Sequence, residues 1–280
     1  MQRFDKPGAP AALAAVLIGI MAWAGPARAA SPFPDKNLEA AIREVLKHEP
    51  KVELTDEKLQ NVYILEASGK GIKDLKGLEK CKNLAQLKLD KNKIVDLAPL
   101  KDLTNLQSLD LSRNAIKDIT PLAKLKGLQH IELSGNQIEK VEALGGLTNL
   151  TSLYLDDNAI ADIAPLATLT RLWSLSLPGN HIKNIKVLEK VTRISSLNLN
   201  GNQIEDIHPL TRLTELKILQ IRSNQIKDLA PLASAAKADA AGPKLFAPYL
   251  RLFIEGNPLS DAAKSAQTKQ LKESGIRIEG

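Results

Sequence analysis

Apolar residues recur along the chain with a period of 22 residues. Seven positions of the repeat are apolar in all eight blocks, and position 12 is always isoleucine while position 18 is always leucine. Self-similarity at a fixed short period is the signature of stacked repeat units. Residues 61–236 are therefore predicted to form eight coils that bury one continuous core. The blocks begin at Asn61, Asn83, Asn105, Gly127, Asn149, Arg171, Arg193 and Glu215.

Within each block, the pattern predicts a short strand followed by a compact return path. Apolar positions 2, 5 and 7 alternate with polar ones, so positions 5–7 are expected to form a strand with one face inward. Position 17 is proline in five blocks and position 14 is aspartate in six. Because proline fixes φ and aspartate caps local turns, the return path should consist of short 3₁₀ or extended pieces. The sequence thus predicts an α/β solenoid with a parallel sheet along one side.

Asparagine occupies position 10 in seven of the eight blocks, and Lys70 is the exception. A buried asparagine can donate to and accept from backbone groups of neighbouring coils, and each such bond is worth about 1 kcal/mol. A structural ladder is therefore expected along the stack, formed by Asn92, Asn114, Asn136, Asn158, Asn180, Asn202 and Asn224.

The segments that flank the repeats have different patterns. In residues 30–60, apolar residues from Leu38 to Leu46 follow helical spacing and Val45 is among them, which predicts a helical N-terminal cap. Residues 237–247 are alanine-rich and are expected to form an insertion loop outside the sheet, with a binding loop as the alternative. Residues 248–259 fit a ninth, partial repeat. Residues 260–280 are expected to form a C-terminal cap of one helix and a closing strand at Ile276–Ile278.

The pattern L-x-x-L-x-L-x-x-N-x-I resembles the leucine-rich repeat in its short 22-residue form, and the whole arrangement is similar to bacterial internalin-like proteins. The resemblance covers about residues 32–259. It implies a curved leucine-rich repeat solenoid with the parallel β-sheet on the concave face, 3₁₀ or extended segments on the convex side, and a helical N-terminal cap. In that family the concave sheet usually binds another protein.

The first 29 residues have the pattern of an export signal. Arg3 and Lys6 precede an apolar run from Ala11 to Ala24, and the run is followed by the small-x-small sequence 27–29. This order is typical of a cleaved signal peptide, and the run is too short to span a membrane comfortably. The protein is therefore expected to be exported, secreted or periplasmic, without membrane insertion. Cleavage removes three basic residues and one acidic residue, which lowers the net charge from +6 to +4.

Residues capable of chemistry are scarce and scattered. The chain has one cysteine and four widely separated histidines, and it lacks phosphate-binding and nucleophile motifs. Cys81 occupies an apolar repeat position and should be a buried hydrophobe. The position-14 aspartates are expected to cap turns, with cation binding as the alternative. They are Asp74, Asp96, Asp118, Asp162, Asp206 and Asp228.

Asp110 and Glu132 share position 6 in adjacent blocks, so their backbones are expected to lie about 5 Å apart on neighbouring strands. A retaining glycosidase needs that separation, but an open sheet offers no water-excluding pocket. The sequence therefore predicts no enzyme, no cofactor and no metal.

The exposed strand positions 3, 4, 6, 8 and 9 carry six basic and seven acidic residues over nine repeats. A face without a basic track argues against nucleic-acid binding. Only 3% of the residues are aromatic, yet Tyr63, Tyr154, Trp173 and Phe253 fall on these positions. Aromatic residues anchor protein interfaces, although strands favour them in any case.

These patterns together predict a monomeric, non-catalytic module that binds an unidentified protein partner through its concave sheet. The alternative is a binder of carbohydrate or envelope polymer, with Trp173 as a stacking platform for a glycan, or a structural envelope protein. The candidate contact residues are His130, Glu132, Tyr154, Asp156, Trp173, Ser174, Ser176, Ser196 and Asn198.

Overall fold

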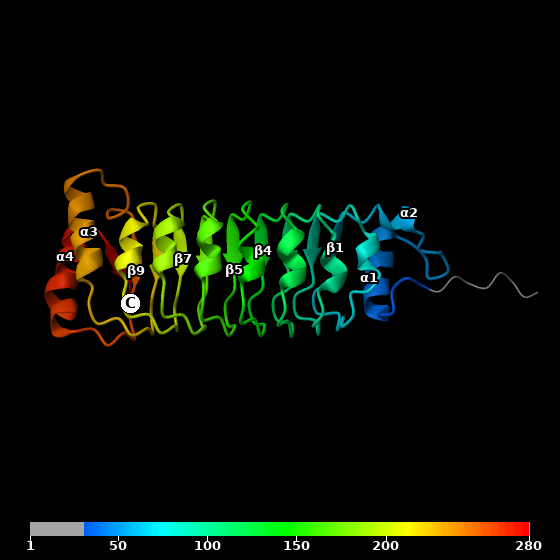
Figure 1. Ribbon diagram of the computed structural model, residues 1–280, viewed down its shortest axis with the longest axis horizontal. Helices are drawn as coiled ribbons and strands as arrows, with labels where there is room; N and C mark the ends of the chain where they lie inside the picture. Colours follow the sequence, from blue (N-terminus) through cyan, green and yellow to red (C-terminus); the bar gives the residue numbers. More distant parts are fainter. Residues whose placement is uncertain (1–30, 280) are drawn as a thin grey trace, which may run out of the picture. The chain divides into compact units, whose positions relative to one another are not determined.

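The computed structural model describes residues 31–279, and the export signal predicted for residues 1–29 lies outside this range. The chain from Ser31 onward forms one compact unit with its own core. Its ten strands make a single parallel sheet in which strand order follows sequence order (Figure 1). The strands are β1 (Ile64–Glu66), β2 (Gln86–Lys88), β3 (Ser108–Asp110), β4 (His130–Glu132), β5 (Ser152–Tyr154), β6 (Ser174–Ser176), β7 (Ser196–Asn198), β8 (Ile218–Gln220), β9 (Arg251–Phe253) and β10 (Arg277–Glu279).

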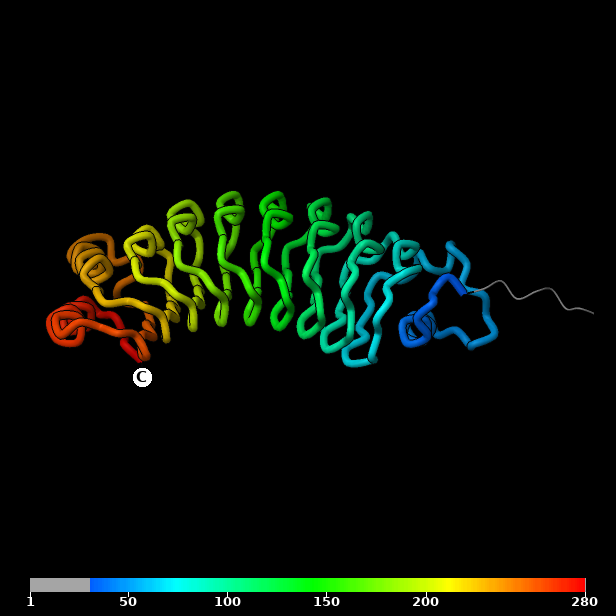
Figure 2. Tube along the Cα trace, turned by 60° about the horizontal axis from the view of Figure 1, so that its bottom comes forward, coloured from blue at the N-terminus to red at the C-terminus, as the bar shows by residue number. Residues whose placement is uncertain are grey.

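The return path of the first seven coils contains a 3₁₀ turn, as predicted from the proline and aspartate positions. On the sheet side, successive coils are spaced at about 4.8 Å, the distance between neighbouring strands. On the other side, the 3₁₀ turns and their side chains need a wider spacing, so the stack bends toward the sheet. Figure 2 shows this arch, with the row of 3₁₀ turns along its outer side. The predicted curved solenoid is thus confirmed. The turns are η1 (Leu78–Lys80), η2 (Ala98–Leu100), η3 (Thr120–Lys124), η4 (Glu142–Leu144), η5 (Ala164–Thr168), η6 (Lys186–Lys190) and η7 (His208–Arg212).

The seven apolar positions of the eight repeats form the core. Every residue at these positions is buried except Ala235, which packs partly against the core. Cys81 is fully buried among them, and burial raises the pKa of its thiol to about 12, with the nearby Glu79 adding to the effect. The core is continuous from one end of the solenoid to the other, so each coil is stabilised mainly by its two neighbours.

A ladder of asparagine side chains joins consecutive coils on the inside. Asn158 is typical: its Nδ2 donates to the carbonyl oxygens of Leu133 and Leu155, and its Oδ1 accepts from the backbone N–H of Ile138. The same three bonds recur at Asn92, Asn114, Asn136, Asn180, Asn202, Asn224 and Asn257. Backbone groups that the strands leave unpaired are satisfied in this way.

The N-terminal cap consists of α1 (Lys36–Leu46) and α2 (Asp56–Leu59). Asp35 caps α1 through the backbone N–H groups of Asn37 and Leu38, and its other oxygen accepts from Lys73 N at 2.7 Å in the first repeat. Burial opposes the charge of this carboxylate, but its backbone N–H donors lower the pKa. One side chain therefore caps the helix and fastens it to the solenoid. Val45 is 38% exposed, so its predicted place on the buried face is wrong.

The eighth coil returns through a full helix, α3 (Ala230–Ala241), in place of a 3₁₀ turn. The prediction of a loop over residues 237–247 is therefore wrong for residues 237–241. Pro231 suits the first turn of a helix, and the alanine-rich sequence that follows has high helix propensity. After the helix, buried Asp239 accepts from the backbone N–H groups of Leu245, Phe246 and Ala247 and fixes the segment that leads to β9.

The C-terminal cap has the predicted helix and closing strand. A π-helical turn, η8 (Ala263–Gln267), continues into α4 (Thr268–Glu273), and Gly275 ends the helix at φ +98° before β10. Gln267 accepts from Leu229 N and donates to Asp228, which ties the cap to the eighth repeat. None of the helices within residues 31–279 has the length and apolar character needed to cross a bilayer.

Candidate binding face

The inner face of the sheet brings the predicted contact residues into register. Asp110, Glu132 and Tyr154 lie side by side on β3, β4 and β5, and the row continues with Ser176 on β6 and Asn198 on β7. His130 lies in a second row with Ser108 and Ser152 on either side. The strands therefore place these side chains on one surface at the spacing of neighbouring strands, about 4.8 Å.

Two carboxylates of this surface are held by serines two residues further along the chain. The Oδ1 of Asp110 accepts from the backbone N–H and the hydroxyl of Ser112, at 3.0 and 2.7 Å. The Oε1 of Glu132 accepts from Ser134 N at 2.9 Å, and the hydroxyl of Ser134 accepts in turn from Asp156 N. Sequence reasoning missed both serines, although the spacing carboxylate–leucine–serine was the available signal. The bonds fix the carboxylates before any partner arrives.

Burial and neighbouring negative charges raise the pKa values of Glu132 and Asp156. Burial raises the pKa of Glu132, and the charges of Asp156 and Asp110 raise it further, against the hydrogen bonds from Ser134. Burial also raises the pKa of Asp156, with a contribution from Asp157. None of the ion pairs within residues 31–279 involves these carboxylates. This part of the face presents uncompensated negative charge.

An aromatic pair lies beside the carboxylates. The rings of His130 and Tyr154 are 5.5 Å apart with an interplanar angle of 50°. Both side chains are half-buried. Such tilted pairs hold one another in place, so Tyr154 is presented in a restricted orientation next to Glu132.

Trp173 differs from Tyr154 in its position on the coil. It directly precedes β6, where the sheet face meets the turn, and it is 59% exposed. Ser174 and Ser176, which follow it, are only 7% and 8% exposed. These two predicted contact residues therefore lie on the face but offer little surface, whereas Ser196 and Asn198 on β7 are half-buried.

The C-terminal end of the face is basic, but its arginines are engaged. Arg222 pairs with Glu255 and Arg251 pairs with Glu279. Both guanidinium groups also lie over the ring of Phe253, at 4.8 and 5.5 Å from its centre. The basic residues at this end are thus largely committed to contacts within the protein.

The position-14 aspartates all cap the turn that follows them. In each of the six, Oδ1 accepts from the backbone N–H two residues later at 2.8–2.9 Å. No cluster of metal-ligating side chains occurs in the described part of the chain.

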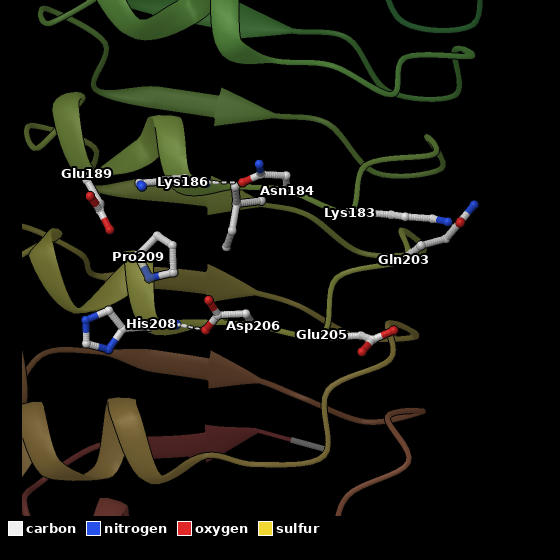
Figure 3. A pocket seen from close by; sticks show the side chains of 10 residues that line it. Lys183, Asn184, Lys186, Glu189, Gln203, Glu205, Asp206, His208 and Pro209 are labelled. Carbon is white, nitrogen blue, oxygen red and sulfur yellow. Dashed lines mark hydrogen bonds between the residues drawn. The ribbon is translucent and has the colours of Figure 1, made fainter.

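A groove on the outer side of the solenoid lies between repeats six and seven (Figure 3). It has a volume of about 490 Å³ and is lined by Ile185, Pro209 and charged side chains. The two hydrogen bonds drawn there run from the backbone N–H of Lys186 to Asn184 and from that of His208 to Asp206, and they are the same turn capping that the position-14 aspartates provide in other coils. A similar groove of about 440 Å³ recurs between repeats three and four. These grooves follow from the coil geometry and carry no distinct chemistry.

Comparison with known proteins places the chain among leucine-rich repeat proteins. A family model described as leucine rich repeats (2 copies) matches residues 104–146, 126–168 and 192–234. Among curated protein sequences there is no match.

Solved structures give the more extensive similarity. Internalin C2 of Listeria monocytogenes is 35% identical, with 73% of this chain and 93% of that chain covered and a TM-score of 0.71. An internalin F of the same species is 30% identical, with 89% and 78% covered and a TM-score of 0.74. A leucine-rich repeat protein of Leptospira interrogans shares the fold at 24% identity, with 72% and 50% covered and a TM-score of 0.63.

Proposed function

Because the chain belongs to the internalin-like bacterial leucine-rich repeat proteins, we propose that it is an exported, non-catalytic module that binds another protein through the concave face of its sheet. The observation that carries the proposal is the preorganised surface on β3, β4 and β5. Its hydrogen-bonded carboxylates and its His130–Tyr154 pair are already ordered. Ordered contact groups reduce the entropy that a partner must overcome on binding.

The charge of this surface indicates what the partner offers. Asp110, Glu132 and Asp156 are partly desolvated and carry no ion pair within residues 31–279. Complementary charge favours association and excludes wrong partners. The partner segment that faces β3–β5 is therefore expected to carry lysine or arginine, beside an apolar group that packs on Tyr154.

The proposal is non-catalytic because the concave face is open and does not enclose a pocket around its carboxylates. Asp110 and Glu132 are neighbours in register, as a retaining glycosidase would need. However, the carboxylates lie on the surface of a sheet, and the two outer grooves described above are lined by other residues. A glycosidase acid needs a pocket that excludes water.

Capture from envelope extracts with the chain 31–280 as bait tests the proposal. Tyr154→Ala is expected to lower the recovery of the wild-type partner at least tenfold, as for a central aromatic anchor. Trp173→Ala tests whether the partner also reaches the border of the face. Val95→Ala, an exposed apolar residue (58%) in the turn after the strand, is the matched control and should have no effect. Equal recovery with wild type and Tyr154→Ala would contradict the proposal.

A glycan or envelope polymer is the second candidate ligand. It is favoured by one observation: exposed Trp173 stands next to the uncharged strands β6 and β7, where serine and asparagine could bond sugar hydroxyls. A glycan array with wild type and Trp173→Ala separates the two candidates. A signal that depends on Trp173 supports the glycan, and a blank array removes it.

A further inference from the structure

The two edges of the solenoid differ in charge. We define the strand-entry edge as the seven segments that lead from one 3₁₀ turn into the next strand: 79–85, 101–107, 123–129, 145–151, 167–173, 189–195 and 211–217. It carries ten basic and four acidic residues. The basic residues are Lys80, Lys82, Lys101, Lys124, Lys126, Arg171, Lys190, Arg193, Arg212 and Lys217.

The opposite edge, repeat positions 9–14 after each strand, is balanced. Its eight segments carry nine basic and nine acidic residues, because the capping aspartates of position 14 offset the lysines there. The surplus positive charge of the chain is therefore concentrated on the strand-entry edge. Apart from Lys80, which pairs with Asp56, none of its basic residues forms an ion pair within residues 31–279. This charge is available to an external anion.

Four of the seven large exposed apolar side chains in residues 31–279 lie in segments that lead into a strand. Trp173 falls within the seven segments, Tyr63 precedes β1, and Leu245 and Tyr249 precede β9, whereas Val45, Ile64 and Val95 lie elsewhere. Tyr63 (55%) and Trp173 (59%) both occupy repeat position 3, directly ahead of the strands. Leu245 (55%) and Tyr249 (62%) lie in the segment between α3 and β9. In Figure 1 this orange segment rises furthest beyond the upper border of the solenoid. Apolar contact points thus occur near both ends and in the middle of the basic edge.

The shape of the edge suits a flat surface. The solenoid bends toward its sheet, so the bend runs about an axis parallel to the strands, and the turns at the ends of the strands remain close to one plane. Figure 1 shows these turns as a nearly straight upper border over the repeats, whereas Figure 2 shows the arch. A planar edge can bring many cations to a planar anionic surface at once.

From these three observations we propose that the strand-entry edge binds the surface of a membrane that contains anionic phospholipid. Lysine and arginine meet the headgroups, and Trp173 and Leu245 enter the interfacial layer, where aromatic and apolar side chains are favoured. A soluble polyanion would use the basic residues but offers no apolar layer for the aliphatic Leu245 to enter, so the lipid surface is the better match. In this orientation the concave face stays open to the side. The inference goes beyond the proposed protein binding and does not depend on it.

Vesicle sedimentation with residues 31–280 tests the inference, because this part of the chain is a compact unit by itself and lacks the apolar N-terminal run. Vesicles of phosphatidylglycerol with phosphatidylcholine should retain the protein at low salt. Vesicles of phosphatidylcholine alone should not. Raising the salt to about 0.5 M should release most of it, since exposed charges are then screened within a few ångströms.

Two triple variants with the same change in net charge provide the critical comparison. Lys82→Glu, Lys124→Glu and Arg193→Glu on the strand-entry edge should lower partitioning more than tenfold, because each basic residue near an anionic surface contributes a several-fold factor. Lys93→Glu, Lys117→Glu and Lys183→Glu on the opposite edge should lower it far less. Equal losses for both triples would overturn the inference, because only net charge would then matter.

Trp173 supplies an independent readout. The chain has two tryptophans and the other is Trp23, so residues 31–280 contain only Trp173. Its emission should shift to the blue with anionic vesicles and should be quenched by brominated lipid. Binding without a shift, or binding to dextran sulfate but not to vesicles, would overturn the inference. Tyr154→Ala should leave vesicle binding unchanged, so failure here and failure of the concave-face proposal can be told apart.

Discussion

The interior of the coils and their concave surface differ in how much the residues vary from one coil to the next. In the interior, seven positions are apolar in every coil and an asparagine recurs in all but the first, where Lys70 replaces it; these residues are buried in the same way from coil to coil, apart from the partly buried Ala235. On the concave surface, neighbouring coils carry different side chains at the same position, such as Asp110, Glu132, Tyr154 and Ser176 in one row. The comparison teaches that uniformity stabilises the solenoid and that variation makes one region of its surface different from the next.

The strongest test of this comparison replaces one core residue. Leu153 is fully buried between the neighbouring strands β4 and β6. Leu153→Ala is expected to lower the free energy of unfolding by about 3 kcal/mol, through lost burial and the cavity left behind. Urea unfolding measures the change. Ser152→Ala, the adjacent residue on the surface side, should cost less than about 0.5 kcal/mol. Similar losses for both variants would remove the distinction between interior and surface.

A smaller effect is expected when one step of the asparagine ladder is removed. Asn158→Ala strands the backbone groups of Leu133, Leu155 and Ile138 in the interior. The expected loss is about 2 kcal/mol in the same assay, because buried polar groups left without a partner are costly. Asp162→Ala removes one exposed capping bond in the same coil and should cost about 1 kcal/mol or less. A reversed order would mean that the ladder carries little of the stability.

The smallest expected effect is a change in stability on replacing a single carboxylate. Its sign at neutral pH should differ between Glu132 on the concave face and Asp118 in a turn. The pKa of Glu132 is raised above 4.5 by burial and by nearby acids, so its charge destabilises the folded state at neutral pH. Glu132→Gln should therefore stabilise the protein at pH 7, and the gain should disappear as the pH falls below about 4.5. Thermal unfolding across this range measures it.

Asp118 should show the opposite sign. Bonds from the backbone N–H and hydroxyl of Thr120 lower its pKa below 3.8, so its charge stabilises the folded state above that pH. Asp118→Asn should destabilise the protein at pH 7, and the difference should vanish in more acidic solution. Stabilisation at pH 7 by Asp118→Asn would contradict a stabilising role for its turn bonds, and destabilisation by Glu132→Gln would contradict the effect of burial on Glu132.

The periodic part of the fold could be predicted because each coil repeats the same physical problem. Ile72 and Leu78, like their counterparts in every block, have to be buried, and one strand and one turn per 22 residues is the arrangement that does so. The helix α3 could not be predicted from periodicity, because alanine on all of its sides leaves no apolar stripe. Its start at Ala230–Pro231 also matches the start of an ordinary 3₁₀ turn.

The candidate face could be predicted only in part. The rows of Glu132 and Tyr154 follow from the register of identical coils. Exposure does not follow from register: Ser174 and Ser176 lie in register with Ser152 and Tyr154, which are half-buried, yet they are only 7% and 8% exposed. The basic strand-entry edge could not be predicted from the sequence either. Its lysines and arginines lie in separate turns along the chain and form one surface only in the stacked solenoid.

The 22-residue spacing holds without a gap from β1 to β8, and this has a consequence for how such a protein changes over evolutionary time. An in-frame duplication or deletion of one unit leaves every asparagine bond and every buried leucine with an equivalent neighbour. The length of the inner wall can therefore grow or shrink by whole coils while the chemistry of each coil is untouched. The length of the concave surface and the side chains that it presents can then evolve separately.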